Sequence, residues 1–229
     1  MLRKIRVRGF KSLEDFELQL RPGLNVLVGP NGAGKTNVLK FLEFLSDLTR
    51  GTVSEAVSHS GGAGDIFRRA ASGEFVKRID FRVEGSGVFR DDVAYRTLRK
   101  SGTIFYNYEA EITLTENSVY YSRQLLELWL DKQSLRRDMS LHCEFDSESN
   151  VRNVKVTISK KLSDLSFISK PKQFLTDLIK QDEVFSERTL FTLLEYFRGG
   201  VRSVTSDIYS GKAYNIIPSR VRAPEDIAR

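Results

Sequence analysis

The stretch Gly29-Pro30-Asn31-Gly32-Ala33-Gly34-Lys35-Thr36 decides how the rest of this sequence is interpreted. It fits the pattern of a glycine, four residues, a second glycine, a lysine and then a serine or threonine, which is typical of a phosphate-binding loop. Glycines let the main chain adopt conformations that a Cβ forbids, so that successive N–H groups can approach phosphate oxygens. The stretch therefore predicts a cradle for the phosphates of a nucleotide.

The sequence on either side of this loop has the arrangement that such a cradle requires. Before the loop, Pro22-Gly23 turns the chain into the apolar run Leu24–Val28, which is typical of a strand covered on both faces. After the loop, apolar residues recur three and four apart and predict an amphipathic helix from Lys35 to about Gly51. These apolar positions are Val38, Leu39, Leu42, Leu45 and Leu48. The N-terminus of that helix would point unpaired N–H groups and a partial positive charge at the anion.

Two side chains of the loop have the chemistry of a magnesium-nucleotide site. Lys35 carries a full mobile charge suited to the β- and γ-phosphates of ATP, and the hydroxyl of Thr36 is a hard oxygen ligand suited to Mg²⁺. We therefore predict that the eight loop residues bind ATP, with Thr36 as the metal ligand. The simpler alternative is a glycine-rich turn that caps a helix and binds nothing.

The remaining sequence predicts a mixed α/β chain in three parts. Residues 1–75 form the phosphate-loop lobe, which begins with a hairpin of two alternating strands and has a short helix and a loop after residue 51. Residues 76–160 repeat a period-two pattern that predicts an antiparallel meander. Residues 161–229 return to helical spacing and lead back to the core, and the helix with apolar residues at 190–197 is expected to end at Gly199-Gly200.

Composition excludes several classes of protein. The chain has 229 residues with a formal net charge of +6, which is ordinary globular composition. It contains one cysteine, Cys143, and two histidines, His59 and His142, so neither an internal disulfide nor a Cys/His zinc site is expected. No apolar run approaches the roughly 18 residues of a membrane helix, so we expect no membrane contact. The single cysteine fits a reducing cytoplasm, so we expect a cytoplasmic location.

The loop and its flanks resemble a known family. Residues 29–37, together with Gly9–Leu13 and residues 22–28, are similar to the amino-terminal part of ABC-type P-loop ATPases of the RecF, SMC and OLD-like group, within the AAA-family ATPases. The resemblance implies an α/β ATPase head with an antiparallel β subdomain, and it places Lys11 and Ser12 beside the nucleotide. It also implies ATP-dependent dimerisation with a second copy or a homologous head. DNA or an effector nuclease would be the further partner, in DNA repair, chromosome maintenance or anti-phage defence.

Parts of the family pattern are missing from the sequence. The acidic pair that activates water in the family has no clear counterpart, because Asp182-Glu183 follows an amphipathic helix and not a buried strand. Ser60-Gly61-Gly62 imitates the family's signature triplet but lies too soon after the loop, and no glutamine occurs between Gln19 and Gln124. We assign no catalytic residue. A truncated chain, a split polypeptide and a degenerate nucleotide-binding protein all fit, as do a regulatory module that does not hydrolyse ATP and a small P-loop kinase.

Basic and aromatic residues raise the question of nucleic-acid contact. Both are also common on solvated faces and in strands, so the two interpretations stay open. The basic groups are Arg96, Arg99, Lys100, Arg136, Arg137, Lys160, Lys161, Lys170 and Lys172, and the tyrosines are Tyr95, Tyr106, Tyr108, Tyr120 and Tyr121.

Overall fold

One antiparallel sheet organises the part of the chain that the computed structural model describes, which is residues 1–70, 73–90, 101–130, 137–148, 150–181 and 183–197 with residues 201, 204 and 208. Its strands are β1 (Leu2–Arg8), β2 (Phe16–Gln19), β3 (Arg78–Arg90), β4 (Ser101–Leu114), β5 (Val119–Trp129), β6 (Met139–Phe145) and β7 (Val151–Ile158). Their order across the sheet is β2-β1-β3-β4-β5-β6-β7. The sheet therefore crosses the domain boundary that the sequence predicts near residue 75.

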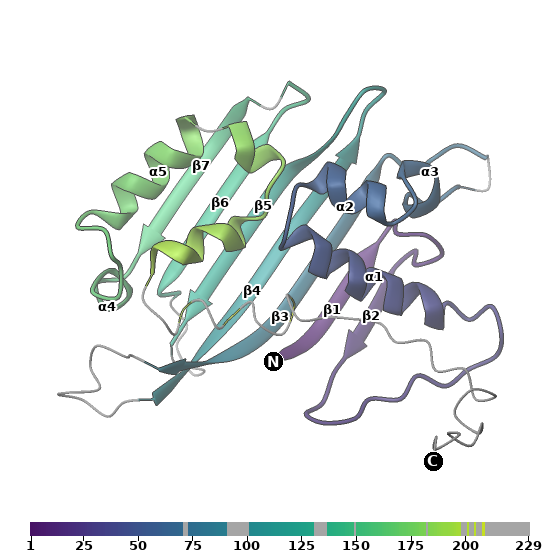
Figure 1. The fold of residues 1–229 in the computed structure, drawn as a ribbon, viewed down its shortest axis with the longest axis horizontal. Helices are drawn as coiled ribbons and strands as arrows, with labels where there is room; N and C mark the ends of the chain where they lie inside the picture. The colour runs from purple at the N-terminus through teal and green to yellow at the C-terminus, as the bar shows by residue number, and fades with distance from the viewer. Residues whose placement is uncertain are drawn as a thin grey trace, which may run out of the picture.

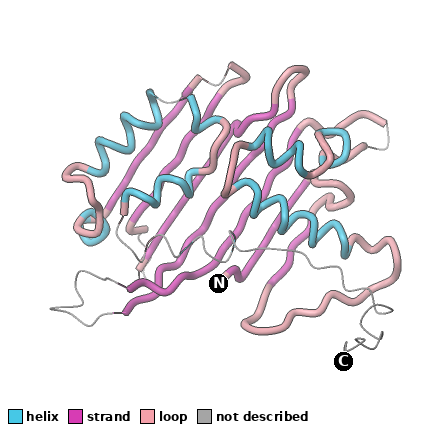
Figure 2. The backbone as a smooth tube through the Cα atoms, in the orientation of Figure 1, coloured by secondary structure: helices cyan, strands magenta, loops and turns pink. Residues whose placement is uncertain are grey.

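The helices give the sheet one covered face and one open face. The helices are α1 (Lys35–Leu48), α2 (Val53–His59), α3 (Ala63–Ile66), α4 (Lys160–Ser163) and α5 (Pro171–Gln181), and the 3₁₀ helices are η2 (Glu183–Ser186) and η3 (Leu190–Tyr196). Helices α1, α2 and α5 lie on the same side of the sheet (Figure 1), and within the described part of the chain no helix lies on the other side (Figure 2). Alternation along β6, from buried Met139 to buried Phe145, follows the same division.

A row of aromatic rings fixes α1 on the sheet. Phe41 of α1 meets the ring of Phe10 at 5.2 Å and that of Phe81 on β3 at 5.7 Å between centroids. Phe81 then contacts Tyr108 on β4 at 5.8 Å, and Tyr108 contacts Phe191 of η3 at 4.5 Å. Edge-to-face and tilted contacts at such distances add to the free energy gained by burial. The row holds the helix that follows the predicted phosphate loop in a set position.

A buried amide ties β5 to the last helices. Gln124 accepts hydrogen bonds from the Tyr108 hydroxyl at 2.6 Å and the Leu190 main-chain N–H at 2.9 Å. Its Nε2 donates to the main-chain oxygens of Phe185 at 2.8 Å and Arg188 at 2.9 Å. Both donor protons and both acceptor positions of the amide are therefore used. This fully buried side chain is therefore a structural link between β5 and the last helices.

Most of the predicted elements are confirmed. The hairpin is formed by β1 and β2, the helix after the loop is α1, and the meander is the antiparallel series β3 to β7. The period-two pattern that predicts the meander lies at residues 79–83, 106–114, 141–145 and 154–158 and did not indicate β5, and the helical spacing near residue 190 did not indicate that η3 is a 3₁₀ helix. The predicted end at Gly199-Gly200 lies outside the described residues.

The prediction of a buried strand at residues 24–28 is wrong for the described structure. The segment forms no strand, and Leu24, Val26 and Val28 are 90%, 70% and 89% exposed. A strand needs a neighbour to take its main-chain hydrogen bonds, and no described residue pairs with this segment. The apolar run therefore lies in the open, directly before the loop.

Candidate nucleotide-binding site

The predicted phosphate loop lies at the N-terminus of α1. Gly32 and Gly34 have φ of +84°, and Gly34 is the residue that caps the helix, with ψ of 4°. A side chain in this left-handed region is strained, so both positions favour glycine. Few main-chain bonds hold the loop, among them the one from the Ala33 N–H to the Pro30 oxygen at 3.3 Å. The glycines therefore shape the turn from which the helix starts.

The main-chain amides of this turn are open donors. The hydrogen bonds of α1 begin at Val38, whose N–H donates to the main-chain oxygen of Gly34 at 3.0 Å. In the part of the chain that the structure describes, the amides of residues 31, 32 and 34–37 find no acceptor. The first turn of a helix leaves such groups for a ligand, and its partial positive charge favours an anion. The turn can therefore take several oxygens of one anionic group.

Lys35 closes the loop in the structure. Its Nζ donates to the main-chain oxygens of Gly29 and Pro30, each at 2.7 Å. The ammonium group thus lies over the loop and within reach of any anion that the open amides bind. Thr36 is exposed, so its hydroxyl can reach a metal ion. Six amides, an ammonium group and a hydroxyl are the donor set that a magnesium triphosphate requires, so these residues fit Mg-ATP.

Ser12 is positioned next to the loop by direct contact. The side-chain nitrogen of Asn37 donates to the Ser12 Oγ at 2.7 Å. A Cβ built on Gly34 would lie 3.4 Å from the same oxygen. The connection between β1 and β2 therefore packs against the start of α1.

Lys11, the neighbour of Ser12, is held against α3 in an unusual conformation. Its φ of 48° is left-handed, and its N–H donates to the Ile66 oxygen at 2.7 Å. The ammonium group donates to the Asp65 main-chain oxygen at 2.9 Å. Burial lowers the pKa of Lys11, and the positive charge of Lys40 lowers it further. An anion between these two cations would relieve their repulsion.

The other residues weighed as catalytic candidates lie apart from the loop. Residues 60–62 form the turn between α2 and α3, with Gly61 and Gly62 at φ of +100° and +87°, so the interpretation of this triplet as a loop is confirmed. Glu183 begins η2 just after α5, which confirms the amphipathic helix before it, and Asp182 lies outside the described residues. Among the described residues, no group of three or more Asp, Glu, His or Cys could hold a metal ion.

The residues considered for nucleic-acid contact and the two histidines lie in different places in the structure. Tyr106, Tyr108, Tyr120 and Tyr121 are buried, so they serve the core and are not available to stack bases. His142 lies on β6 with its Nε2 3.5 Å from a Glu144 carboxylate oxygen, and His59 lies at the end of α2. Lys160 and Lys161 begin α4, and Lys172 lies in α5. The basic residues 96, 99, 100 and 136, with Tyr95, lie outside the described residues.

Comparison with known proteins finds ATPases, in agreement with the phosphate loop. Residues 1–196 match a family model described as AAA ATPase domain. The DNA replication and repair protein RecF of Corynebacterium jeikeium is 40% identical over 99 residues, which are 43% of this chain and 20% of that protein. The OLD nuclease of Thermus scotoductus is 47% identical over 45 residues, which are 20% of this chain and 8% of that protein. The Rad50 ATPase of Methanopyrus kandleri, named for DNA double-strand break repair, is 48% identical over 40 residues, which are 18% of this chain and 5% of that protein.

These matches confirm the resemblance that the loop and its flanks predict. The chain spans about a fifth or less of the length of each of the three relatives. In addition, no described helix has the length and apolar character needed to cross a bilayer.

Proposed function

Because the chain belongs to the AAA ATPase domain family, we propose that it is the Mg-ATP-binding part of an ABC-type ATPase head that works on DNA in the cytoplasm. The observation that carries the proposal is the open turn at the start of α1. There, the amides of residues 31, 32 and 34–37 lack acceptors within the described structure, and the ammonium group of Lys35 lies over the loop. These groups together suit a bound triphosphate.

Each residue of the site has a role in this proposal. The main-chain amides and Lys35 bind the β- and γ-phosphates, and Thr36 binds Mg²⁺, which supplies charge neutralisation of the phosphates when it is present. Asn37 holds Ser12 against the loop, and Lys11 offers a second cation from the same connection. The chain's own contribution is therefore to bind and orient the nucleotide, because phosphoryl transfer depends mainly on positioning and charge stabilisation.

The exposed segment at residues 24–28 favours the interpretation that further strands complete the ATPase head. Leu24, Val26 and Val28 present a row of apolar side chains on an unpaired main chain, which costs free energy in water. We infer that this segment pairs with strands outside the described residues, and that these carry the acidic pair and the signature triplet of a complete head. ATP would then lie between two such heads, the second being another copy of this protein or a homologous head. Binding of ATP would be coupled to DNA or to an effector nuclease, in repair or anti-phage defence.

A nucleotide-binding module that does not hydrolyse ATP is the second candidate. It is favoured by the absence, among the described residues, of any acidic cluster able to hold a metal ion. Two measurements on the full chain separate the candidates. Light scattering with a non-hydrolysable ATP analogue and Mg²⁺ should show a doubled mass for a head, and phosphate release should rise when DNA is added. A monomer that binds the analogue without releasing phosphate from ATP would favour the second candidate.

A further inference from the structure

The open face of the sheet carries a cluster of arginines around a hollow of about 450 Å³. The five cations that line it are all arginines and come from strands β1, β3 and β5: Arg6, Arg8, Arg78, Arg82 and Arg123. We call this set the arginine hollow. Their side chains are 46% to 59% exposed, so the guanidinium groups are within reach of a ligand.

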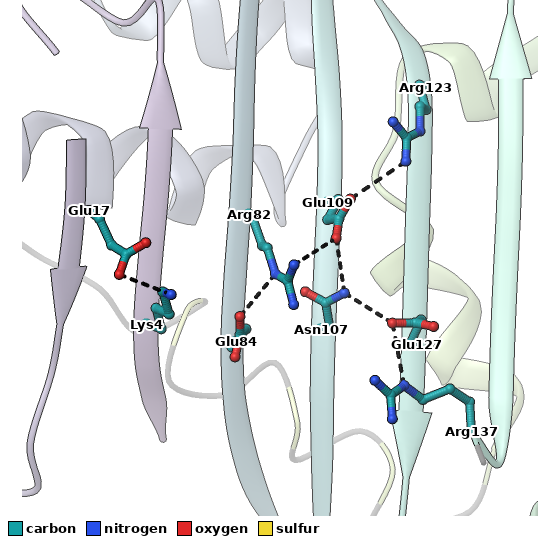
Figure 3. A network of polar contacts seen from close by, with 9 residues as sticks. All are labelled: Lys4, Glu17, Arg82, Glu84, Asn107, Glu109, Arg123, Glu127 and Arg137. Carbon is teal, nitrogen blue, oxygen red and sulfur yellow. Dashed lines mark hydrogen bonds and ion pairs between the residues drawn. The ribbon is translucent and has the colours of Figure 1, made fainter. Parts of the chain in front are cut away.

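Carboxylates hold these arginines in place without using most of their hydrogen-bonding capacity. Glu109 lies between Arg82, at 3.4 Å from its Nη1, and Arg123, at 3.6 Å from its Nη2 (Figure 3). Glu111 lies 3.3 Å from the Arg78 Nε. Each guanidinium group has five N–H donors, and Arg78 and Arg123 each have one such carboxylate contact. The other N–H groups of these arginines are the donors that an anion bound across the strands would use.

The arginines of the hollow are held by exposed ion pairs. Three carboxylates line the hollow with the five arginines, which gives 5 − 3 = +2, and Asp15 and Glu84 beside it bring the balance to 5 − 5 = 0. The remaining carboxylate contacts come from outside the hollow, from Asp15 to Arg6 and Arg8 and from Glu84 to Arg82. Burial and the nearby Glu111 carboxylate raise the pKa of Asp80, which lies inside. Exposed ion pairs of this kind are weak, so a phosphate can replace them.

Aromatic rings lie on the same face beyond the hollow, on β4 and β5. Phe105 and Trp129 stack with centroids 6.1 Å apart and an interplanar angle of 20°. Tyr106 faces the helices, so its neighbour Phe105 lies on the open face. The Arg137 guanidinium lies 4.2 Å from the Trp129 ring centroid. Phe105 is four residues from Glu109, or about 13 Å along the strand. Arginines with aromatic rings suit the phosphates and bases of one nucleic-acid strand better than an acidic peptide, which has no bases to stack.

We propose that the open sheet face binds single-stranded DNA, with backbone phosphates in the arginine hollow and an unpaired base stacked at the Phe105–Trp129 pair. The proposal relies on the proposed function only for the choice of DNA over RNA. The hollow is separate from the phosphate loop, because α1 lies on the opposite face of the sheet (Figure 1).

The test uses the chain's one tryptophan, Trp129, as a reporter on this face. The full chain is titrated with a 20-nucleotide oligothymidylate at several salt concentrations, while tryptophan fluorescence and the fluorescence anisotropy of the labelled oligonucleotide are followed. Wild type should show quenching of Trp129 and a salt-dependent affinity. The variant Arg123→Gln should bind several-fold more weakly, with a log–log salt slope reduced by about 0.7. The matched control is Arg152→Gln, which removes an exposed arginine of β7 outside the hollow and should bind like wild type.

A second pair of variants tests the direction of the charge effect. Glu109→Gln releases Arg82 and Arg123 and should tighten binding several-fold, whereas Glu144→Gln makes the same charge change on β6 of the same face and should not. Equal effects within either matched pair would overturn the proposal, as would displacement of the oligonucleotide by polyglutamate at equal charge. A duplex that binds as tightly as the single strand would overturn the stacked base. Lys35→Ala should leave oligonucleotide binding unchanged, so a failure of this inference is distinguishable from a failure of the nucleotide site.

Discussion

The Asn37 side chain donates a hydrogen bond to the Ser12 Oγ at 2.7 Å, and this bond joins the first turn of α1 to the connection between β1 and β2. The two residues are 25 positions apart, and both lie where the family resemblance places nucleotide contacts. The bond is therefore a direct link between the sheet and the predicted phosphate loop.

This link should be measurable as a coupling between the two residues. We expect the double variant Ser12→Ala, Asn37→Ala to lose less free energy of unfolding than the sum of the two single losses, by about 0.5–1 kcal/mol. Either change alone removes the same exposed hydrogen bond. Urea denaturation of the two single variants and the double variant gives the coupling. Strict additivity would mean that the contact contributes nothing to stability.

Removing the buried amide of Gln124 should destabilise the fold strongly. Gln124→Leu leaves the Leu190 N–H and two main-chain oxygens without this partner and takes one partner from the Tyr108 hydroxyl, so we expect a loss of at least about 3 kcal/mol in the free energy of unfolding. Urea denaturation measures it. The exposed Gln173→Leu on α5 is the control and should change stability little. Equal stability of the two variants would contradict the role given to Gln124.

Two glycines with similar backbone angles should respond differently to alanine. Gly9 and Gly73 have φ of +77° and +86°, which costs an alanine about 1–2 kcal/mol at either site. A Cβ on Gly9 would also collide with the Arg78 main-chain oxygen, whereas one on Gly73 meets nothing within 4 Å. Gly9→Ala should therefore lower the melting temperature more than Gly73→Ala. A reversed order would show that the close approach of β1 and β3 is not a constraint.

Stability should depend on pH through Asp15. Hydrogen bonds from Arg8 and then Arg6 hold the pKa of this carboxyl well below its ordinary value of 3.8. Because the folded pKa is depressed, the stabilisation is present above pH 3.8 and is lost as the pH falls towards the folded pKa. Asp15→Asn should thus melt below wild type at pH 7, and the gap should narrow below about pH 4. Thermal melts across this range test it, with the exposed Glu116→Gln as the control. A gap that stays constant with pH would contradict the pairing.

The sequence predicted those parts of the fold whose signal is local. The glycines at positions 32 and 34, the spacing of α1 and the alternation of β6 each follow from neighbouring residues, and the structure contains all three features. The open donors of the turn also follow from the residue types, because a helix N-terminus leaves its first amides unpaired.

The parts that failed depend on what lies beside them in space. The run at residues 24–28 has the composition of a buried strand, but burial needs neighbouring strands that the described residues do not supply. Strand β5 was missed because Gln124 interrupts its apolar face, and only the distant partners Leu190 and Phe185 explain a buried amide there. The arginine hollow was likewise hidden, since its arginines lie on β1, β3 and β5, which are far apart in the chain and share one face only in the folded sheet.

Binding of Mg-ATP to the full chain with and without Lys35 tests the central claim most directly. Titration calorimetry with a non-hydrolysable ATP analogue and Mg²⁺ should show binding by wild type and by the exposed control Lys172→Ala, and none by Lys35→Ala, with the far-UV circular dichroism of all three unchanged. The same affinity in Lys35→Ala as in wild type would contradict the assignment of residues 29–36 as a phosphate cradle.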